Sequence, residues 1–128
     1  MIDELIGQKF TSCMAQEGLG NGLLFTGGNE FTGLYFSLIH VFHKGEKFIV
    51  TNPKDHGKNK ILDKEIVNAV LKIDGTLEVY LSDEIKLVFP FSGNVEAWEL
   101  RLIERYIFSL PGGGWSGSST KKPNRSKI

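Results

Sequence analysis

The sequence predicts a mainly β protein in which an antiparallel meander forms a small sandwich or a partly open barrel. Turn-forming groups of Gly, Asn, Asp and Pro recur about every ten residues along the chain. The runs between these groups are rich in β-branched and aromatic residues, and several alternate apolar with polar positions. The length of 128 residues fits one domain. An α+β fold is the alternative, because one segment near the C-terminus has a mixed pattern.

A hairpin over residues 70–81 is the clearest element. Its centre is Asp74-Gly75, a pair that readily adopts the positive φ angles of a type I′ turn. After the turn, successive side chains are expected on opposite faces of a strand. The apolar face holds Leu77, Val79 and Leu81, and the other face holds Glu78 and Tyr80. The same alternation continues over residues 85–89.

Residues 34–50 predict a second hairpin, with its turn at Lys44-Gly45. The first half of this segment is apolar on both faces, with Phe42 on one face and Val41 on the other. A strand of this kind is expected at the centre of a sheet and covered on both sides.

Residues 94–110 allow two interpretations. Trp98, Leu100 and Leu102 alternate as in a strand, whereas Trp98, Leu102 and Tyr106 recur every four residues as in a helix that Asn94 could cap. We expect two strands here, with a helix as the alternative.

An internal repeat is suggested by two segments with similar apolar placement. Residues 6–15 match residues 62–71 at an offset of 56, and a strand-rich stretch follows each of them. The match predicts two similar β units that share one core.

The domain is expected to span residues 1–115, followed by a flexible basic tail over residues 116–128 that is rich in Gly and Ser. The only charges after Gly112 are basic: Lys121, Lys122, Arg125 and Lys127. Residues 1–111 therefore carry a net charge of about −4, with 11 basic and 15 acidic residues. An acidic body argues against nucleic-acid binding, which requires basic charge, and it suits a basic protein partner.

A cytoplasmic location is expected from three features. Cys13 is the single cysteine, so no intrachain disulfide can form, which suits a reducing compartment. No apolar run approaches the ~20 residues that span a bilayer. The N-terminus lacks the basic and apolar regions of a secretory signal. No membrane association is expected.

The sequence predicts no catalytic residue, no metal site and no cofactor. His40 and His43 lie three residues apart on a predicted strand, so they point to opposite faces, and only a turn at Lys44-Gly45 could bring them together on one ion. Cys13 lies in an alternating apolar stretch, which favours a small buried side chain over a reactive thiol. If the protein were an enzyme, His40, Asp55 and His56 would be the first residues to consider.

Three motifs resemble a pattern in an uncharacterised bacterial family, a domain of unknown function of about this size. They are Asp74-Gly75 with the alternation that follows it, Glu96-Ala97-Trp98-Glu99-Leu100, and Leu110-Pro111-Gly112-Gly113-Gly114. The likeness covers residues 62–114 best and departs at Asp63, where such proteins often have glycine. It implies a small β fold and no established activity. A looser likeness extends to proteins that act beside bacterial toxins as immunity proteins.

The main functional hypothesis is an immunity protein that binds a cognate, basic bacterial toxin and blocks its active site without catalysis. Trp98 is interpreted as a core residue, with an aromatic anchor at the interface as the alternative reading. The candidate contact residues are Glu78, Tyr80, Asp83, Glu84, Glu96 and Glu99. The alternative function is a scaffold or small-ligand-binding domain that forms a homodimer along an exposed β edge.

Overall fold

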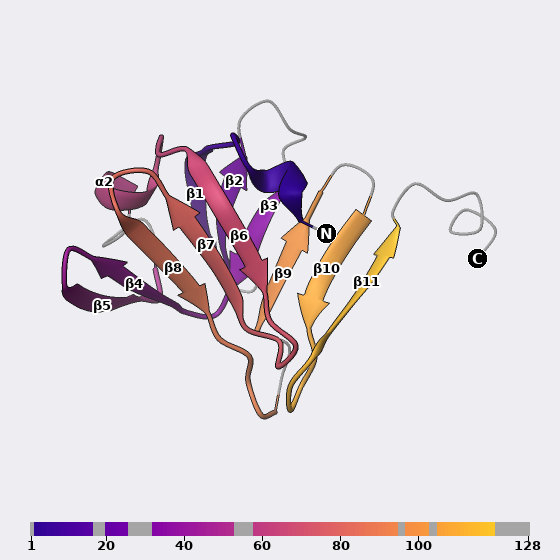
Figure 1. Ribbon diagram of the computed structural model, residues 1–128. Helices are drawn as coiled ribbons and strands as arrows, with labels where there is room; N and C mark the ends of the chain where they lie inside the picture. The colour runs from indigo at the N-terminus through magenta and orange to yellow at the C-terminus, as the bar shows by residue number, and fades with distance from the viewer. Residues whose placement is uncertain are drawn as a thin grey trace.

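The computed structural model describes residues 2–16, 20–25, 32–52, 58–94, 97–102 and 105–119. Within these ranges the chain forms two antiparallel sheets, one of six strands and one of five (Figure 1). The predicted mainly β class is confirmed. The sheets face each other as a sandwich and do not close into a barrel.

The six-stranded sheet has the order β1-β2-β3-β9-β10-β11. Its strands are β1 (Phe10–Gln16), β2 (Gly20–Phe25), β3 (Gly33–Phe36), β9 (Trp98–Arg101), β10 (Arg105–Ser109) and β11 (Trp115–Ser119). The five-stranded sheet has the order β5-β4-β8-β7-β6. Its strands are β4 (Ile39–His43), β5 (Glu46–Val50), β6 (Ile66–Leu71), β7 (Leu77–Leu81) and β8 (Ile85–Phe89). The described helices are a 3-10 turn, η1 (Asp3–Leu5), and one α-helical turn, α2 (Lys58–Ile61).

The core lies between the two sheets, where alternation directs the apolar side chains inward. The face of β7 predicted to be apolar is buried, with Leu77 and Val79 each 0% exposed. Phe36 of one sheet meets Phe89 of the other edge-to-face, with ring centroids 5.7 Å apart. Contacts of this kind bury large aromatic surfaces and hold the sheets together.

The predicted repeat appears in the topology. Strands β1, β2 and β3 form a meander in one sheet, and the hairpin β4–β5 that follows them lies in the other sheet. Strands β6, β7 and β8 form the same meander in the second sheet, and the hairpin β9–β10 returns to the first. The first residue of β1, Phe10, and the first residue of β6, Ile66, are separated by the offset of 56.

The two units meet at residues that are equivalent by this offset. Lys9 and Glu65 form a bridge between the starts of β1 and β6. The amide of Gly7 donates to the carbonyl of Ile66 at 2.8 Å, and the amide of Asp63 donates to the carbonyl of Phe10 at 2.7 Å. The offset of 56 relates Gly7 to Asp63 and Phe10 to Ile66, so the two bonds are equivalent in the two units. The repeat is therefore an approximate two-fold arrangement centred on the Lys9–Glu65 bridge.

Residues 34–50 differ from the prediction. The expected first strand is divided between β3 and β4, which belong to different sheets. The amide of Ser37 donates to the carbonyl of Ala97 at 3.0 Å, where the chain crosses from one sheet to the other. Strand β4 is central, as expected, but its outer face is not covered by any described element, and Phe42 is only half-buried there. Because the alternation of side chains continues from β3 into β4, the sequence pattern does not indicate that the chain changes sheets here.

Two further expectations are resolved near the C-terminus. Within residues 94–110 the described segments form β9 and β10, so the helical alternative is wrong. The boundary at residue 116 is also wrong, because β11 continues to Ser119 and pairs with β10 along its whole length. Trp115 packs partly buried against the core. Backbone pairing and this one ring stabilise a segment whose composition suggests disorder. Residues 120–128 lie outside the described residues.

Candidate functional site

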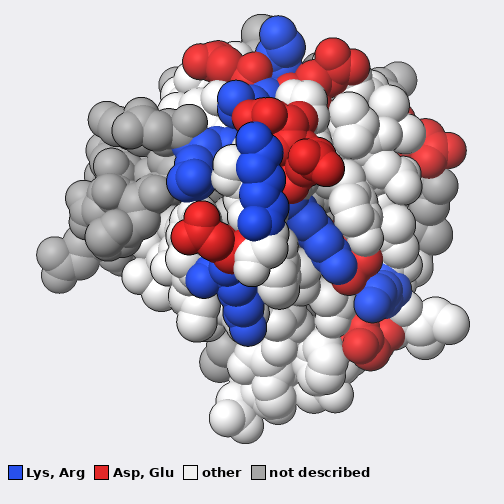
Figure 2. All heavy atoms as spheres, turned by 60° about the vertical axis from the view of Figure 1, so that its left-hand side comes forward, with Lys and Arg blue, Asp and Glu red and all other residues white. Residues whose placement is uncertain are grey.

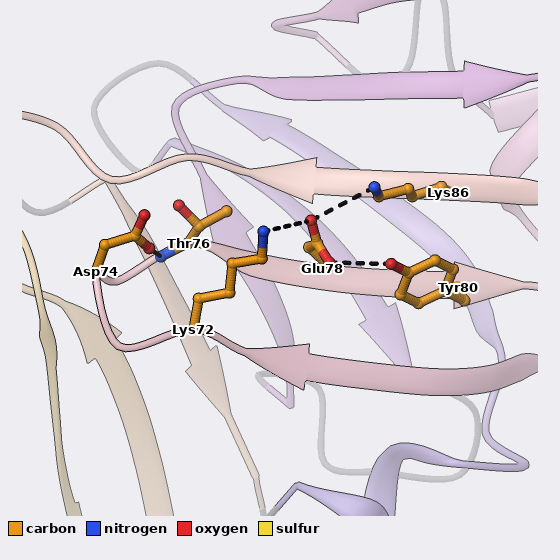
Figure 3. A network of polar contacts seen from close by, with 6 residues as sticks. All are labelled: Lys72, Asp74, Thr76, Glu78, Tyr80 and Lys86. Atoms are coloured by element: carbon orange, nitrogen blue, oxygen red, sulfur yellow. Dashed lines mark hydrogen bonds and ion pairs between the residues drawn. The ribbon is translucent and has the colours of Figure 1, made fainter.

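Glu78 forms the centre of a polar network on the outer face of the five-stranded sheet. Figure 3 shows its carboxylate between the ammonium groups of Lys72 and Lys86, at 3.3 and 3.4 Å. The hydroxyl of Tyr80 donates to the same carboxylate at 3.0 Å. These neighbours cover the side chain, so that Glu78 is only 8% exposed although it points outward.

Burial by itself would raise the pKa of the Glu78 carboxyl. The hydrogen bonds from Tyr80 and Lys72, together with the charges of Lys86 and Lys72, outweigh this effect and lower the pKa below its ordinary value. Glu78 is therefore ionised at neutral pH, and its charge is satisfied within the sheet.

Cations and aromatic rings alternate in a row across four strands of this face. Strand register places Lys47, Phe42, Lys86 and Tyr80 side by side. The ammonium groups of Lys47 and Lys86 each lie 5.7 Å from the Phe42 ring centre, and Lys86 lies 5.6 Å from that of Tyr80. Figure 2 shows basic and acidic side chains close together on the side that carries β4, β5 and β8. Around Glu78 and Tyr80 the lysines outnumber the carboxylate, which disfavours a basic partner at this face.

Asp83 and Glu84 lie at one end of the same sheet, in the turn between β7 and β8. The amide of Ser82 donates to the carbonyl of Glu65 at 2.8 Å, which brings this turn beside the start of β6. Lys64 forms an ion pair with Asp83 at 3.6 Å. Four exposed carboxylates therefore gather here, and we call this surface the acidic end: Asp63, Glu65, Asp83 and Glu84.

Glu99 lies on β9 of the six-stranded sheet, whereas Glu78 lies on β7 of the five-stranded sheet. Its carboxylate pairs with Arg101 at 3.1 Å, and the Arg101 guanidinium lies 5.0 Å from the ring centre of Tyr35. Partial burial raises the pKa of Tyr35, Arg101 opposes this rise, and Glu99 adds to it. Glu96 lies outside the described residues. The predicted contact residues are thus divided among two opposite faces and one end, and no single partner surface includes them all.

The three motifs of the sequence resemblance meet at one corner of the sandwich. The indole nitrogen of Trp98 donates to the carbonyl of Gly75 at 2.8 Å, and the amide of Gly114 donates to the carbonyl of Asp74 at 2.7 Å. Trp98 is 2% exposed, so it is a core residue and not an interface anchor. Because these backbone groups bond to one another, the Pro-Gly-Gly-Gly segment serves to hold the two sheets together at this corner. No pattern in the sequence indicates that the motifs touch.

The histidines do not converge in the described part of the chain. His40 lies on the outer face of β4, and Nδ1 of His43 lies 3.3 Å from Nζ of Lys60. Asp55 and His56 are outside the described residues. Among the residues that the structure describes, no three His, Cys, Asp or Glu side chains are grouped so that they could hold a metal ion. Neither described helix has the length or apolarity to cross a bilayer.

A scan of protein-family models, a search of curated proteins and a search of solved structures each found no match to this chain. The class of the protein is therefore defined by its own geometry. It is a two-sheet antiparallel β protein built from two similar units, with a cation–aromatic row on one outer face and an acidic end beside it.

Proposed function

We propose that this protein is a cytoplasmic immunity protein that binds a cognate bacterial toxin and covers its active site. We assign the contact to the acidic end, which includes two of the contact residues predicted from the sequence. The proposed partner is a basic protein, and no catalysis is involved. Asp83 and Glu84 are the predicted contact residues that fit this assignment.

The backbone of the acidic end is the observation that carries the proposal. Asp63, Asp83 and Glu84 have φ angles of 66°, 67° and 60°. A non-glycine residue in this left-handed region costs about 1–2 kcal/mol, and glycine would remove most of that cost. Each position instead holds a carboxylate exposed to solvent. Strained backbone positions cluster at functional sites, and three of them lie together at this end of the sheet, whereas Lys44 is a single position in a different turn.

The chemistry of a nuclease-type toxin fits such a surface. Its active site must carry basic side chains to hold phosphate groups. Carboxylates presented by a rigid sheet end can occupy the positions of those phosphates and exclude the substrate. Steered association between opposite charges also speeds capture of the toxin.

The experiment separates binding from stability. The double variant Asp83→Asn/Glu84→Gly places Asn-Gly, a pair that tolerates left-handed φ angles, in the β7–β8 turn. We expect the free energy of unfolding to rise by about 1 kcal/mol, measured by urea denaturation, because strain is relieved. Protection against the toxin encoded beside the protein's gene should fall about tenfold or more, measured by growth of cells that express both, because two charges facing the toxin are lost.

The matched control is Lys44→Asn in the β4–β5 turn. Lys44 and Gly45 have φ angles of 51° and 85°, so this change also creates an Asn-Gly turn, in a different hairpin of the same sheet. It should raise stability and leave protection unchanged. The proposal is overturned if the neighbouring gene product is not toxic, if the wild-type protein does not protect, or if the double variant protects as well as the control.

A further inference from the structure

The free edge of β11 differs from the other sheet edges in the described structure. Strands β1 and β6 are edge strands, but the Lys9–Glu65 bridge joins them to each other and each contains a register shift. Strand β5 carries two exposed charges, Glu46 and Lys47. Bulges and charges of this kind protect sheet edges from pairing with other chains. Strand β11 has neither, since its sequence Trp-Ser-Gly-Ser-Ser is uncharged and its register with β10 is regular.

Two hydrogen bonds in the turns next to β10 show which backbone groups of β11 point toward β10 and which point to the free edge. Leu110 donates to the carbonyl of Gly114 at 2.9 Å, and Leu102 donates to the carbonyl of Arg105 at 2.8 Å. Antiparallel pairs alternate between bonded and non-bonded positions. Both bonds therefore direct the carbonyl of Gly114 and the backbone groups of residues 116 and 118 toward β10. The amides and carbonyls of residues 115, 117 and 119 point to the free edge, where no described strand pairs with them.

We propose that β11 pairs with β11 of a second copy of this chain, antiparallel and centred on Gly117, to form a continuous sheet across a symmetric dimer. In this register Gly117 faces its own counterpart, and Trp115 faces Ser119 of the second copy. The outward backbone groups thus coincide in pairs, and about six inter-strand hydrogen bonds can form. A two-fold axis through Gly117 makes the edge complementary to itself, as a closed dimer requires.

The composition of the edge also favours a second copy as the occupant. None of the five residues of β11 is charged, so two copies can pair along this edge without like charges facing each other. The dimer goes beyond the immunity function, because the two use different sheets. Strand β11 is an edge of the six-stranded sheet, whereas the acidic end belongs to the five-stranded sheet.

Sedimentation equilibrium combined with amide hydrogen exchange tests the dimer in the full chain. The mass should approach twice that of the monomer as the concentration rises to about 1 mM. Over the same range, exchange of the Gly117 amide should slow, because that amide is bonded only in the dimer.

A charge variant tests the register. Ser116→Lys/Ser118→Lys places lysines of the two copies opposite each other across the axis, and like charges at such positions repel. We expect the dimer to weaken about tenfold or more. The control Ile49→Lys/Val70→Lys adds the same charge to exposed positions of the other sheet and should dimerise like the wild type.

Three results would overturn the proposal. The first is a protein that stays monomeric at the highest concentration, which would leave the edge to a strand from a different protein or to none. The second is a dimer in which the Gly117 amide exchanges at its monomer rate. The third is a folded lysine variant that dimerises as well as the control. Should that variant fail to fold, the exchange of Gly117 in the wild type decides the matter by itself.

Discussion

Glu78 is a carboxylate that the sheet itself neutralises. It projects from the outer face of β7, yet Lys72, Lys86 and Tyr80 occupy its hydrogen-bonding sites and leave it 8% exposed. A charge in this position is costly to bury alone, and its three partners offset that cost. Its role is to hold β6, β7 and β8 in register on the outer face, because each of its partners comes from one of these strands or their ends.

Glu78→Gln should change the pH dependence of stability. The folded-state pKa of Glu78 is lowered, so its contribution is fully present above the unfolded value of about 4.3 and is lost as the pH falls through the lower folded value. At pH 7 the variant should lose about 1–2 kcal/mol of unfolding free energy, and the difference from wild type should shrink below pH 4.3. Urea denaturation between pH 7 and pH 3 measures this.

Tyr80→Phe tests the same network with a smaller change. It removes one donor to the Glu78 carboxylate and keeps both lysines, so its effect should have the same sign and be smaller. A constant difference between Glu78→Gln and wild type at every pH would show that the ion pairs contribute nothing to folding.

At the scale of elements, the corner between the β6–β7 turn and the segment before β11 decides how the sheets meet. Gly75 has a φ of 98°, and its carbonyl accepts the indole N–H of Trp98 from the opposite sheet. A Cβ at Gly75 would overlap the backbone of Gly114. Neither backbone can move without breaking the bond between Gly114 and Asp74, so the close approach requires glycine at this position.

Gly75→Ala should lower the unfolding free energy by about 3 kcal/mol or more, because steric overlap adds to the cost of a positive φ. Gly45→Ala is the matched control. Its φ of 85° is similar, but nothing lies within 4 Å of an added Cβ, so it should lose only about 1 kcal/mol. Thermal and urea unfolding of both variants measure the difference. Equal losses would contradict the structural role of this corner.

At the scale of the whole molecule, the two similar units exchange strands. Each unit places three strands in one sheet and its hairpin in the other, so both sheets contain strands from both halves of the chain. Neither unit can close a core by itself. The arrangement also explains why equivalent residues, Lys9 and Glu65, form the bridge where the two units meet.

Fragments 1–56 and 57–128 should therefore fail to fold separately and should recover a cooperative unfolding transition when mixed. The physical reason is that each fragment alone leaves one face of its meander without the opposing sheet. Circular dichroism and thermal unfolding of each fragment and of the equimolar mixture provide the measurement. Cooperative unfolding of either fragment by itself would show that the units are independent.

Local patterns in the sequence predict much of the secondary structure. Alternation identifies β7 and β8 and their buried faces, and the turn residues Asp74-Gly75 locate the hairpin between β6 and β7. These features depend on neighbours within a few residues, where chain geometry leaves few options. Strand β11 is missed because its residues have little apolar surface, and its order comes from pairing with β10.

The candidate site is harder to predict than the strands. Asp83 and Glu84 can be selected from the sequence as exposed turn residues, but Asp63 and Glu65 join them only because β6 lies beside the β7–β8 turn. Glu78 looks like an available contact residue in the sequence, and only its neighbours across two other strands reveal that its charge is satisfied. Distances between residues that are remote in sequence do not follow from local pattern.

By itself, the sequence determined the β class, the repeat offset and the alternation that separates core from surface, because these depend on the period of side chains along one strand. The tertiary structure alone decided which strands share a sheet, where the chain crosses between β3 and β4, and which charges are paired. Those features depend on contacts between distant segments, and many pairings of the same strands would satisfy the same local pattern.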